Sequence, residues 1–200
     1  MIGRGKKREG ELPEELTSSQ REKLIILARD AIRSAANGEP LSTPVVSDQA
    51  FKRPSGVFVT LTETVGDLRG CIGYIKPDYP LVQAVVYAAE AAALRDPRFP
   101  PVSPGEVNGL KISISILHPT RVIRDISEII PGRDGLIVRK GLRQGLLLPQ
   151  VANRHGWGVE RFLEETCAKA GLSRSEWRDP GTVIEAFTAE VFGEDEQMGD

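Results

Sequence analysis

Apolar residues recur along the chain at two spacings, and each spacing predicts a different kind of element. From Ser19 to Gly38 the spacing is helical. The apolar residues on that face are Leu24, Leu27, Ala28, Ala31, Ile32 and Ala35. Ser19 with Glu22 three residues later has the pattern of a capping box, so we expect the helix to begin there and to stop at Gly38. The proline-containing residues 38–56 are expected to form a loop.

Alternation of apolar and polar residues predicts three strands in the first two thirds of the chain. Residues 57–63 and 68–75 are separated by a turn at Gly66, which predicts a hairpin. In its second strand the period of two places Arg69, Cys71 and Gly73 on one face, and Leu68, Gly70 and Ile72 on the other. Residues 110–117 alternate most regularly; their expected inward side chains are Leu110, Ile112, Ile114 and Ile116.

The remaining segments complete an alternation of helices and hairpins. The expected elements are an alanine-rich helix at 80–94, a proline-stiffened loop at 95–104, an irregular stretch at 119–134, a hairpin of 135–140 with 145–149, a helix at 159–170 ended by Gly171, and a strand at 182–192. Because the strands come mainly in hairpins, we predict an α+β fold with a largely antiparallel sheet and packed helices.

The length, net charge and cysteine content of the chain limit its size class, its partners and its compartment. Two hundred residues suffice for one core or two small lobes, and a net charge of −2 gives no general attraction to nucleic acid. The two cysteines are far apart, which indicates a reducing compartment, and no apolar run is long enough to span a membrane. We therefore expect a cytoplasmic protein without membrane or nucleic-acid partners. Residues 1–16 are interpreted as a flexible tail, 17–193 as the domain and 194–200 as an acidic tail.

Cys71 is the main candidate for chemistry. Glycines at 70 and 73 weaken a strand and often mark a close approach of a ligand or another backbone. Arg69, expected on the same face as Cys71, would lower the pKa of the thiol and favour a nucleophilic thiolate. The alternative is a packed structural cysteine, since free cysteine is among the most buried residues. Cys167 lies on the apolar face of a predicted helix and is interpreted as core.

Other polar residues have two interpretations each. Arg98 could clamp a carboxylate or phosphate, or pair internally with Asp96. Gln150, after Pro149, could point into a cleft or bond to local backbone. His118 and His155 could act as general bases. Histidines in such positions are more often surface or capping residues. No metal-ligand spacing or phosphate-binding glycine motif is present, so we predict neither a metal site nor a cofactor.

Four blocks in order carry a resemblance to a known family. They are LRGCIG at 68–73, DPRFPPV at 96–102, GLLLPQVA at 145–152, and FLEETCAKAGL at 162–172 followed by Trp177. Together they resemble the AMMECR domain family over about residues 17–193. The resemblance implies a compact α+β protein with a larger and a smaller lobe and a cleft between them.

The resemblance also implies a functional surface at the RGCIG motif, in a pathway shared with a Memo-like and a radical-SAM protein. The motif corresponds to Arg69, Gly70, Cys71, Ile72 and Gly73 of this chain. From the argument above we take Cys71 as the catalytic candidate, and we take the other four as binding candidates. The other blocks add Asp96, Arg98, Pro149 and Gln150. Two hypotheses follow: an enzyme or enzyme subunit that uses Cys71, or a non-catalytic binding or adaptor module for a protein or small ligand.

Overall fold

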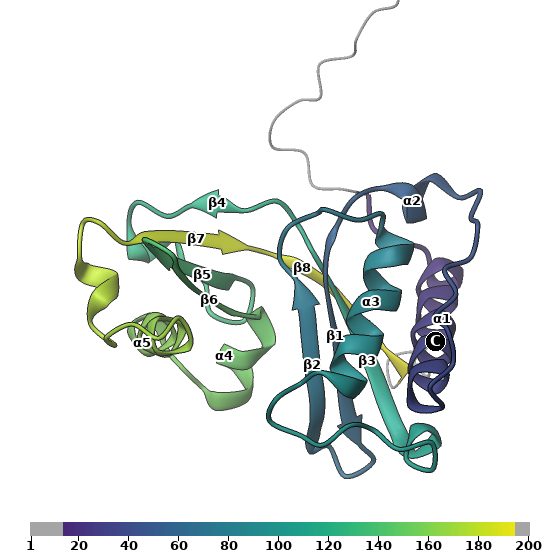
Figure 1. Cartoon of the computed structure of the whole chain (residues 1–200). Coiled ribbons are helices and arrows are strands. Elements are labelled where there is room, and N and C mark those ends of the chain that lie inside the picture. Colours follow the sequence, from purple (N-terminus) through teal and green to yellow (C-terminus); the bar gives the residue numbers. More distant parts are fainter. Residues whose placement is uncertain (1–13, 195–200) are drawn as a thin grey trace, which may run out of the picture.

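A computed structural model describes residues 14–194, which fold into two lobes (Figure 1). The large lobe contains α1 (Ser18–Ala36), α2 (Gln49–Lys52), β1 (Gly56–Glu63), β2 (Leu68–Tyr74), α3 (Leu81–Leu94), the 3₁₀ turn η1 (Val107–Gly109), β3 (Leu110–Leu117) and β8 (Ala189–Gly193). The small lobe contains β4 (Arg121–Val122), η2 (Ile126–Glu128), β5 (Gly135–Lys140), β6 (Arg143–Leu147), α4 (Pro149–His155), α5 (Val159–Lys169), η3 (Glu176–Arg178) and β7 (Val183–Phe187).

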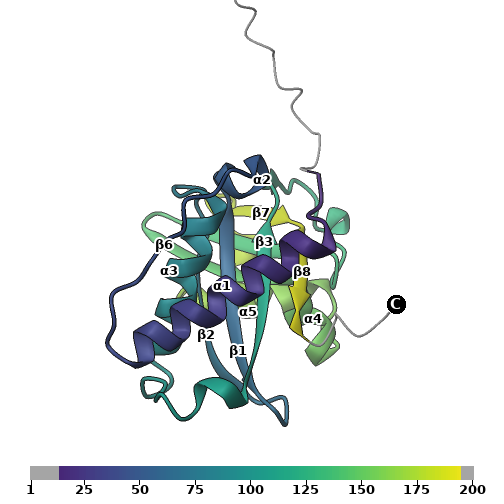
Figure 2. The ribbon, with the colours of Figure 1, turned by 90° about the vertical axis from the view of Figure 1, so that its right-hand side faces the viewer.

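Each lobe is built on a four-stranded sheet. The strand orders are β2-β1-β3-β8 in the large lobe and β4-β7-β5-β6 in the small lobe, and every pairing is antiparallel. Helices α1 and α3 cover one face of the large sheet, and the small lobe lies on the other side of that sheet (Figures 1 and 2). The predicted α+β class with antiparallel strands is therefore confirmed, with two sheets in place of one.

The core of the large lobe follows the predicted alternation. Val57, Val59 and Leu61 are fully buried beneath α3, and the inward residues predicted for 110–117 are all buried in β3. The small side chains of α3 bring its backbone close to β2: a Cβ added at Gly70 would lie 2.2 Å from the Ala92 carbonyl oxygen. The alanine-rich helix therefore packs against the sheet, as its composition predicts.

Two features of the N-terminal half differ from the sequence prediction. Helix α1 is capped by Thr17, whose hydroxyl accepts the Gln20 N–H while the Gln20 side chain accepts the Thr17 N–H, so the predicted Ser19–Glu22 box is wrong. The expected loop at 38–56 contains α2, where the Asp48 carboxylate caps the helix by accepting the Ala50 N–H.

The small lobe contains more regular structure than predicted. The stretch 119–134, expected to be irregular, contains β4, which pairs with β7. Pro149 was predicted to end a strand but is the first residue of α4, where its missing N–H costs no hydrogen bond. The predicted strand 182–192 is interrupted at Thr188, so that β7 belongs to the small sheet and β8 to the large one.

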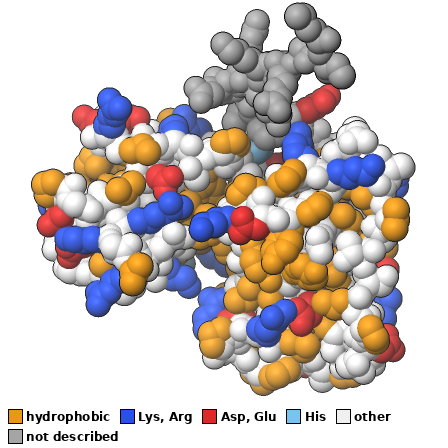
Figure 3. All heavy atoms as spheres, turned by 45° about the horizontal axis from the view of Figure 1, so that its top comes forward, with side chains coloured by type: hydrophobic (Ala, Val, Ile, Leu, Met, Phe, Trp, Pro, Cys, Tyr) orange, Lys and Arg blue, Asp and Glu red, His pale blue; other side chains and the backbone are white. Residues whose placement is uncertain are grey.

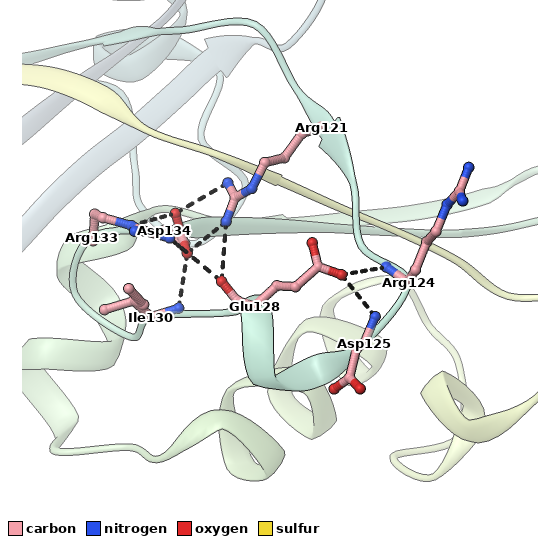
Figure 4. A network of polar contacts seen from close by, with 7 residues as sticks. All are labelled: Arg121, Arg124, Asp125, Glu128, Ile130, Arg133 and Asp134. Atoms are coloured by element: carbon pink, nitrogen blue, oxygen red, sulfur yellow. Dashed lines mark hydrogen bonds and ion pairs between the residues drawn. The ribbon is translucent and has the colours of Figure 1, made fainter.

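A buried carboxylate organises the loop before β5 (Figure 4). Asp134 is fully buried and accepts hydrogen bonds from the side chains of Arg121 and Arg133 and from the Ile130 N–H. Burial alone would raise the pKa of Asp134, but the two guanidinium groups and the N–H lower it below the ordinary value. Asp134 is therefore an ionised, fully partnered anchor of the small lobe.

The chain passes between the lobes at two neighbouring places. The first crossing follows β3 and the second is Thr188. At these crossings the His118 N–H donates to the Thr188 carbonyl at 2.9 Å, and His118 Nδ1 lies 2.8 Å from Thr188 Oγ1. An apolar cluster around Phe187 also joins the lobes. It contains Ile137, Leu146, Leu148 and Phe187, with Phe58, Ile75, Leu117 and Val151 packed against it.

The predicted tails lie mostly outside the described residues. Leu16, assigned to the first tail, is buried, and its N–H donates to the Glu190 carboxylate. Glu194, assigned to the acidic tail, binds the Arg29 side chain and accepts the Ile112 N–H. The described part of each tail therefore belongs to the large lobe. In the described part of the chain, none of the helices has the length and apolar character needed to cross a membrane.

Candidate functional site

A pocket of about 420 Å³ lies where the small lobe meets the face of the large sheet that faces away from α3. Its large-lobe wall is formed by Phe58, Thr60, Thr62, Leu68, Cys71, Arg98, Lys111, Ile112, Ser113 and residues 191–194. Its small-lobe wall is formed by Leu146, Leu147, Leu148, Gln150, Val151, Arg154 and Lys169. We call it the inter-lobe pocket. A notch between the lobes is visible in Figure 3, with Lys and Arg side chains beside it.

A bulge in β2 decides which motif residues reach this pocket. Leu61 pairs with Gly70 and Thr62 with Leu68, so Arg69 is an extra residue in the ladder. The bulge places Leu68 in the pocket wall, whereas Arg69 forms an ion pair with Glu106 at 3.0 Å. The prediction that Arg69 shares a face with Cys71 and lowers its pKa is therefore wrong: the charges that act on the thiol are those of Arg98, Asp96 and Lys169.

Of the RGCIG residues, Cys71 alone lines the pocket. Gly70 lies against Ala92 of α3, and Ile72 packs against the large-lobe core. A Cβ at Gly73 would come within 2.4 Å of the Phe58 ring, so the fold itself requires this glycine. The close approach that the two glycines predict is thus made by α3 at one glycine and by Phe58 at the other.

Cys71 is held by two polar contacts. Its Sγ lies 3.2 Å from the hydroxyl of Thr60, and its backbone N–H donates to Asp96 Oδ2 at 2.8 Å. Burial raises the pKa of the Cys71 thiol above its ordinary value, and it outweighs the Thr60 contact and the positive charges of Arg98 and Lys169. At neutral pH the residue is therefore a neutral thiol in the pocket wall.

Asp96 and Arg98 form a two-point ion pair beside Cys71. Arg98 Nε and Nη2 donate to the two carboxylate oxygens at 2.9 and 2.6 Å. Hydrogen bonding to Arg98 lowers the pKa of Asp96 to about 2, even though its side chain is almost completely buried. The internal pairing that we considered for Arg98 is thus present. The side chain of Arg98 is also 45% exposed and lines the pocket, so pairing does not remove it from the site.

Gln150 reaches across the pocket from α4 to the large sheet. Its Nε2 donates to Ser115 Oγ at 3.1 Å, and its Oε1 is buried without a hydrogen-bond partner among the described residues. The side chain of Gln150 thus bonds to the other lobe, and the residue contributes to the lining of the inter-lobe pocket. Pro149, its neighbour, is buried and is not among the residues that line the pocket.

Three basic residues of the pocket were missed from the sequence: Lys111, Arg154 and Lys169. Lys111 lies on the outward face of β3, Arg154 in the last turn of α4 and Lys169 at the end of α5. The polar positions of β3 could have indicated Lys111. No local pattern indicates that two helices distant in sequence deliver Arg154 and Lys169 to one pocket.

The histidines and Cys167 lie outside the pocket lining. His118 pairs with Thr188 at the lobe crossing, and burial lowers its pKa. The ring of His155 stacks on that of Trp157 at 4.6 Å. Cys167 is fully buried in the small-lobe core, as predicted. Among residues 14–194 there is no group of three or more His, Cys, Asp and Glu side chains that could hold a metal ion.

These features define a two-lobed α+β protein with a partly apolar, basic pocket between its lobes. The profile of the AMMECR1 family matches residues 25–192, and the chain belongs to that family.

Relatives from other organisms match along most of their length. A protein of Thermococcus gammatolerans is 46% identical over 186 residues, which cover 88% of this chain and 91% of the relative. A protein of Aquifex aeolicus is 40% identical, over 88% of this chain and 94% of its own. The crystal structure of an uncharacterised protein from Pyrococcus horikoshii is similar with a TM-score of 0.85 and 42% identity, over 90% of this chain and 94% of that one.

Proposed function

We propose that this protein binds a small molecule in the inter-lobe pocket, and that Cys71 contacts this ligand as part of the wall. The observation that carries the proposal is the pocket itself. Its volume of about 420 Å³ lies in the range of small-molecule sites. Its walls combine apolar side chains with a few polar groups from several segments, the composition typical of such sites.

The state of Cys71 favours binding over nucleophilic catalysis. A cysteine nucleophile reacts as the thiolate, whereas burial raises the pKa of this thiol. In addition, neither His118 nor His155 lines the pocket to act as its base.

A second candidate function is an enzyme or enzyme subunit that uses Cys71. The observation that favours it is that Cys71 lines the pocket near two cations, Arg98 and Lys169, which favour the thiolate. This candidate predicts that Cys71→Ala abolishes biological activity in a strain lacking the native protein, whereas ligand binding alone predicts that much of the activity remains.

An association with a Memo-like and a radical-SAM protein, implied by the family resemblance, remains a prediction. Co-purification of this chain with either protein would support it. Co-purification that is unchanged by Cys71→Ser would separate the association from any chemistry of the thiol. Failure to bind either protein would leave small-molecule binding as the function to be pursued.

The proposed binding is tested by nuclear magnetic resonance with a library of small fragments. We expect hits to shift the backbone amide signals of β3, β8 and α4. Val191→Trp adds bulk at the pocket wall and should abolish these shifts, while the matched variant Val122→Trp, at an exposed position of β4, should retain them. Fragments that bind only elsewhere, or equally well to Val191→Trp, would contradict the proposal.

A further inference from the structure

We propose that the ligand of the inter-lobe pocket is an organic anion, with a phosphate or carboxylate group held by basic side chains of both lobes and an apolar body on the pocket wall. This inference rests on the proposed function and adds the chemical class of the ligand. It depends on three observations: the charge of the lining, its distribution between the lobes and the apolar surface beside it.

Basic groups outnumber acidic groups around the pocket. Arg98, Lys111, Arg154 and Lys169 line it, against the single carboxylate of Glu194. That carboxylate is bound to Arg29 and to the Ile112 N–H. Arg154 and Lys169 have no ion-pair partner among the described residues. Cations gathered at a low-dielectric concave surface attract an anion more strongly than the same charges on an open surface.

The basic groups come from both lobes. Arg98 belongs to the large lobe and is oriented by its two-point bond to Asp96. Lys169 belongs to the small lobe, at the end of α5, and both cations lie close enough to act on the Cys71 thiol. An anionic group placed beside Cys71 therefore meets Lys169 of the small lobe and Arg98 of the large lobe, although the Asp96 carboxylate offsets part of the attraction of Arg98. Such a group bridges the lobes. Guanidinium and ammonium groups are the usual protein ligands of phosphate and carboxylate.

The pocket also offers a surface for an apolar group. Phe58 and Leu68 contribute to one wall, and Leu146, Leu147 and Val151 to the opposite wall. An inorganic anion alone would leave this surface hydrated, whereas an organic anion would bury it and gain the corresponding free energy. Gln150 contributes to the same lining and is held against the large sheet by its bond to Ser115.

Matched probe pairs test the inference. Phenyl phosphate and phenol, and benzoate and benzamide, differ mainly in charge, and their binding can be followed on the amide signals of Leu147, Val191 and Gly193. We expect the anions to bind about tenfold tighter than their neutral partners, and to weaken as sodium chloride is added. The double variant Arg154→Gln/Lys169→Gln should weaken the anions about tenfold and leave the neutral probes unchanged.

A matched double variant controls for the change in net charge. Lys76→Gln/Arg124→Gln removes the same two charges from exposed positions outside the pocket and should leave all affinities unchanged. Equal binding of neutral and anionic probes, or full binding of anions by the Arg154→Gln/Lys169→Gln variant, would overturn the anionic class while leaving small-molecule binding intact. If neither the probes nor any library fragment shifted the pocket amides, the proposed function itself would fail.

Discussion

At the scale of single residues, β2 shows how a motif can be divided between structure and site. Because of the bulge at Arg69, the side chain of Arg69 pairs with Glu106 and Leu68 lies in the pocket wall. The glycine at 70 admits α3, and Cys71 keeps its N–H bonded to Asp96. Most of the motif therefore holds the pocket wall in place, and only Cys71 forms part of its surface.

Gly70→Ala tests the packing of α3 on β2. The added methyl group would lie 2.2 Å from the Ala92 carbonyl oxygen, so β2 and α3 must separate. We expect a loss of about 2–3 kcal/mol in the free energy of unfolding, measured with urea. Gly105→Ala, where an added Cβ meets no atom within 4 Å, is the matched control and should change little. Equal stability of the two variants would show that α3 does not require the glycine.

The lowered pKa of Asp96 predicts how the stability of the fold depends on pH. Its pKa is lowered to about 2 from an ordinary value of 3.8, so its ionised form stabilises the fold above pH 4 and that contribution is lost as the pH falls toward 2. Asp96→Asn should therefore cost about 2 kcal/mol near pH 7, and the difference from the wild type should shrink as the pH falls below 4. Urea unfolding across this range measures it, with exposed Asp78→Asn as the control. A difference that stays constant with pH would contradict the assignment.

At the scale of elements, alternation and helical spacing predict most of the large lobe, because β1 and β3 each bury one face and α1 buries one stripe. The bulge was not predicted, since it depends on the register against β1. The break at Thr188 was also missed, because the sequence of β7 and β8 has the pattern of one continuous strand. The pocket was predicted only through Cys71, Arg98 and Gln150. Lys169 and Arg154 join it through the docking of the lobes, which no local pattern encodes.

The Asp134 network is the element-scale prediction (Figure 4). Asp134→Asn removes the charge that two arginines and the Ile130 N–H share, and leaves donors without an acceptor in the small lobe. We expect a loss of about 2–3 kcal/mol in the free energy of unfolding. This loss is smaller than that for breaking a fully buried ion pair, because both arginines are partly exposed. Trp157 and Trp177 both lie in the small lobe, so tryptophan fluorescence reports its unfolding.

The matched control is Asp30→Asn, which breaks an exposed pair with Arg33 on α1. Such a pair contributes well under about 1 kcal/mol, so this variant should unfold like the wild type. If Asp134→Asn were equally harmless, the network would not anchor the small lobe.

At the scale of the whole molecule, the two lobes share one apolar cluster and two chain crossings. Phe187 is almost completely buried in that cluster, next to Leu146 and Leu148. The pocket is formed between the lobes, so its shape depends on how firmly they are joined.

Phe187→Ala tests the coupling of the lobes. We expect a loss of about 3–4 kcal/mol, because a buried aromatic ring is removed. Tryptophan fluorescence follows the small lobe, and far-UV circular dichroism is dominated by the large lobe, which holds the two longest helices, α1 and α3. The two signals should unfold together in the wild type and separate in Phe187→Ala. Coincident transitions in the variant would show that other contacts couple the lobes.

The most direct test of the account is the alkylation rate of Cys71 in the native protein as a function of pH, followed by mass spectrometry with Cys167 as the internal control. Because Cys71 lines the pocket as a neutral thiol, it should react faster than the fully buried Cys167, with a midpoint above the ordinary thiol pKa. Rapid alkylation with a midpoint well below that value would show an activated thiolate. It would contradict the assignment of Cys71 as a neutral, non-catalytic thiol and favour the enzyme that uses it as a nucleophile.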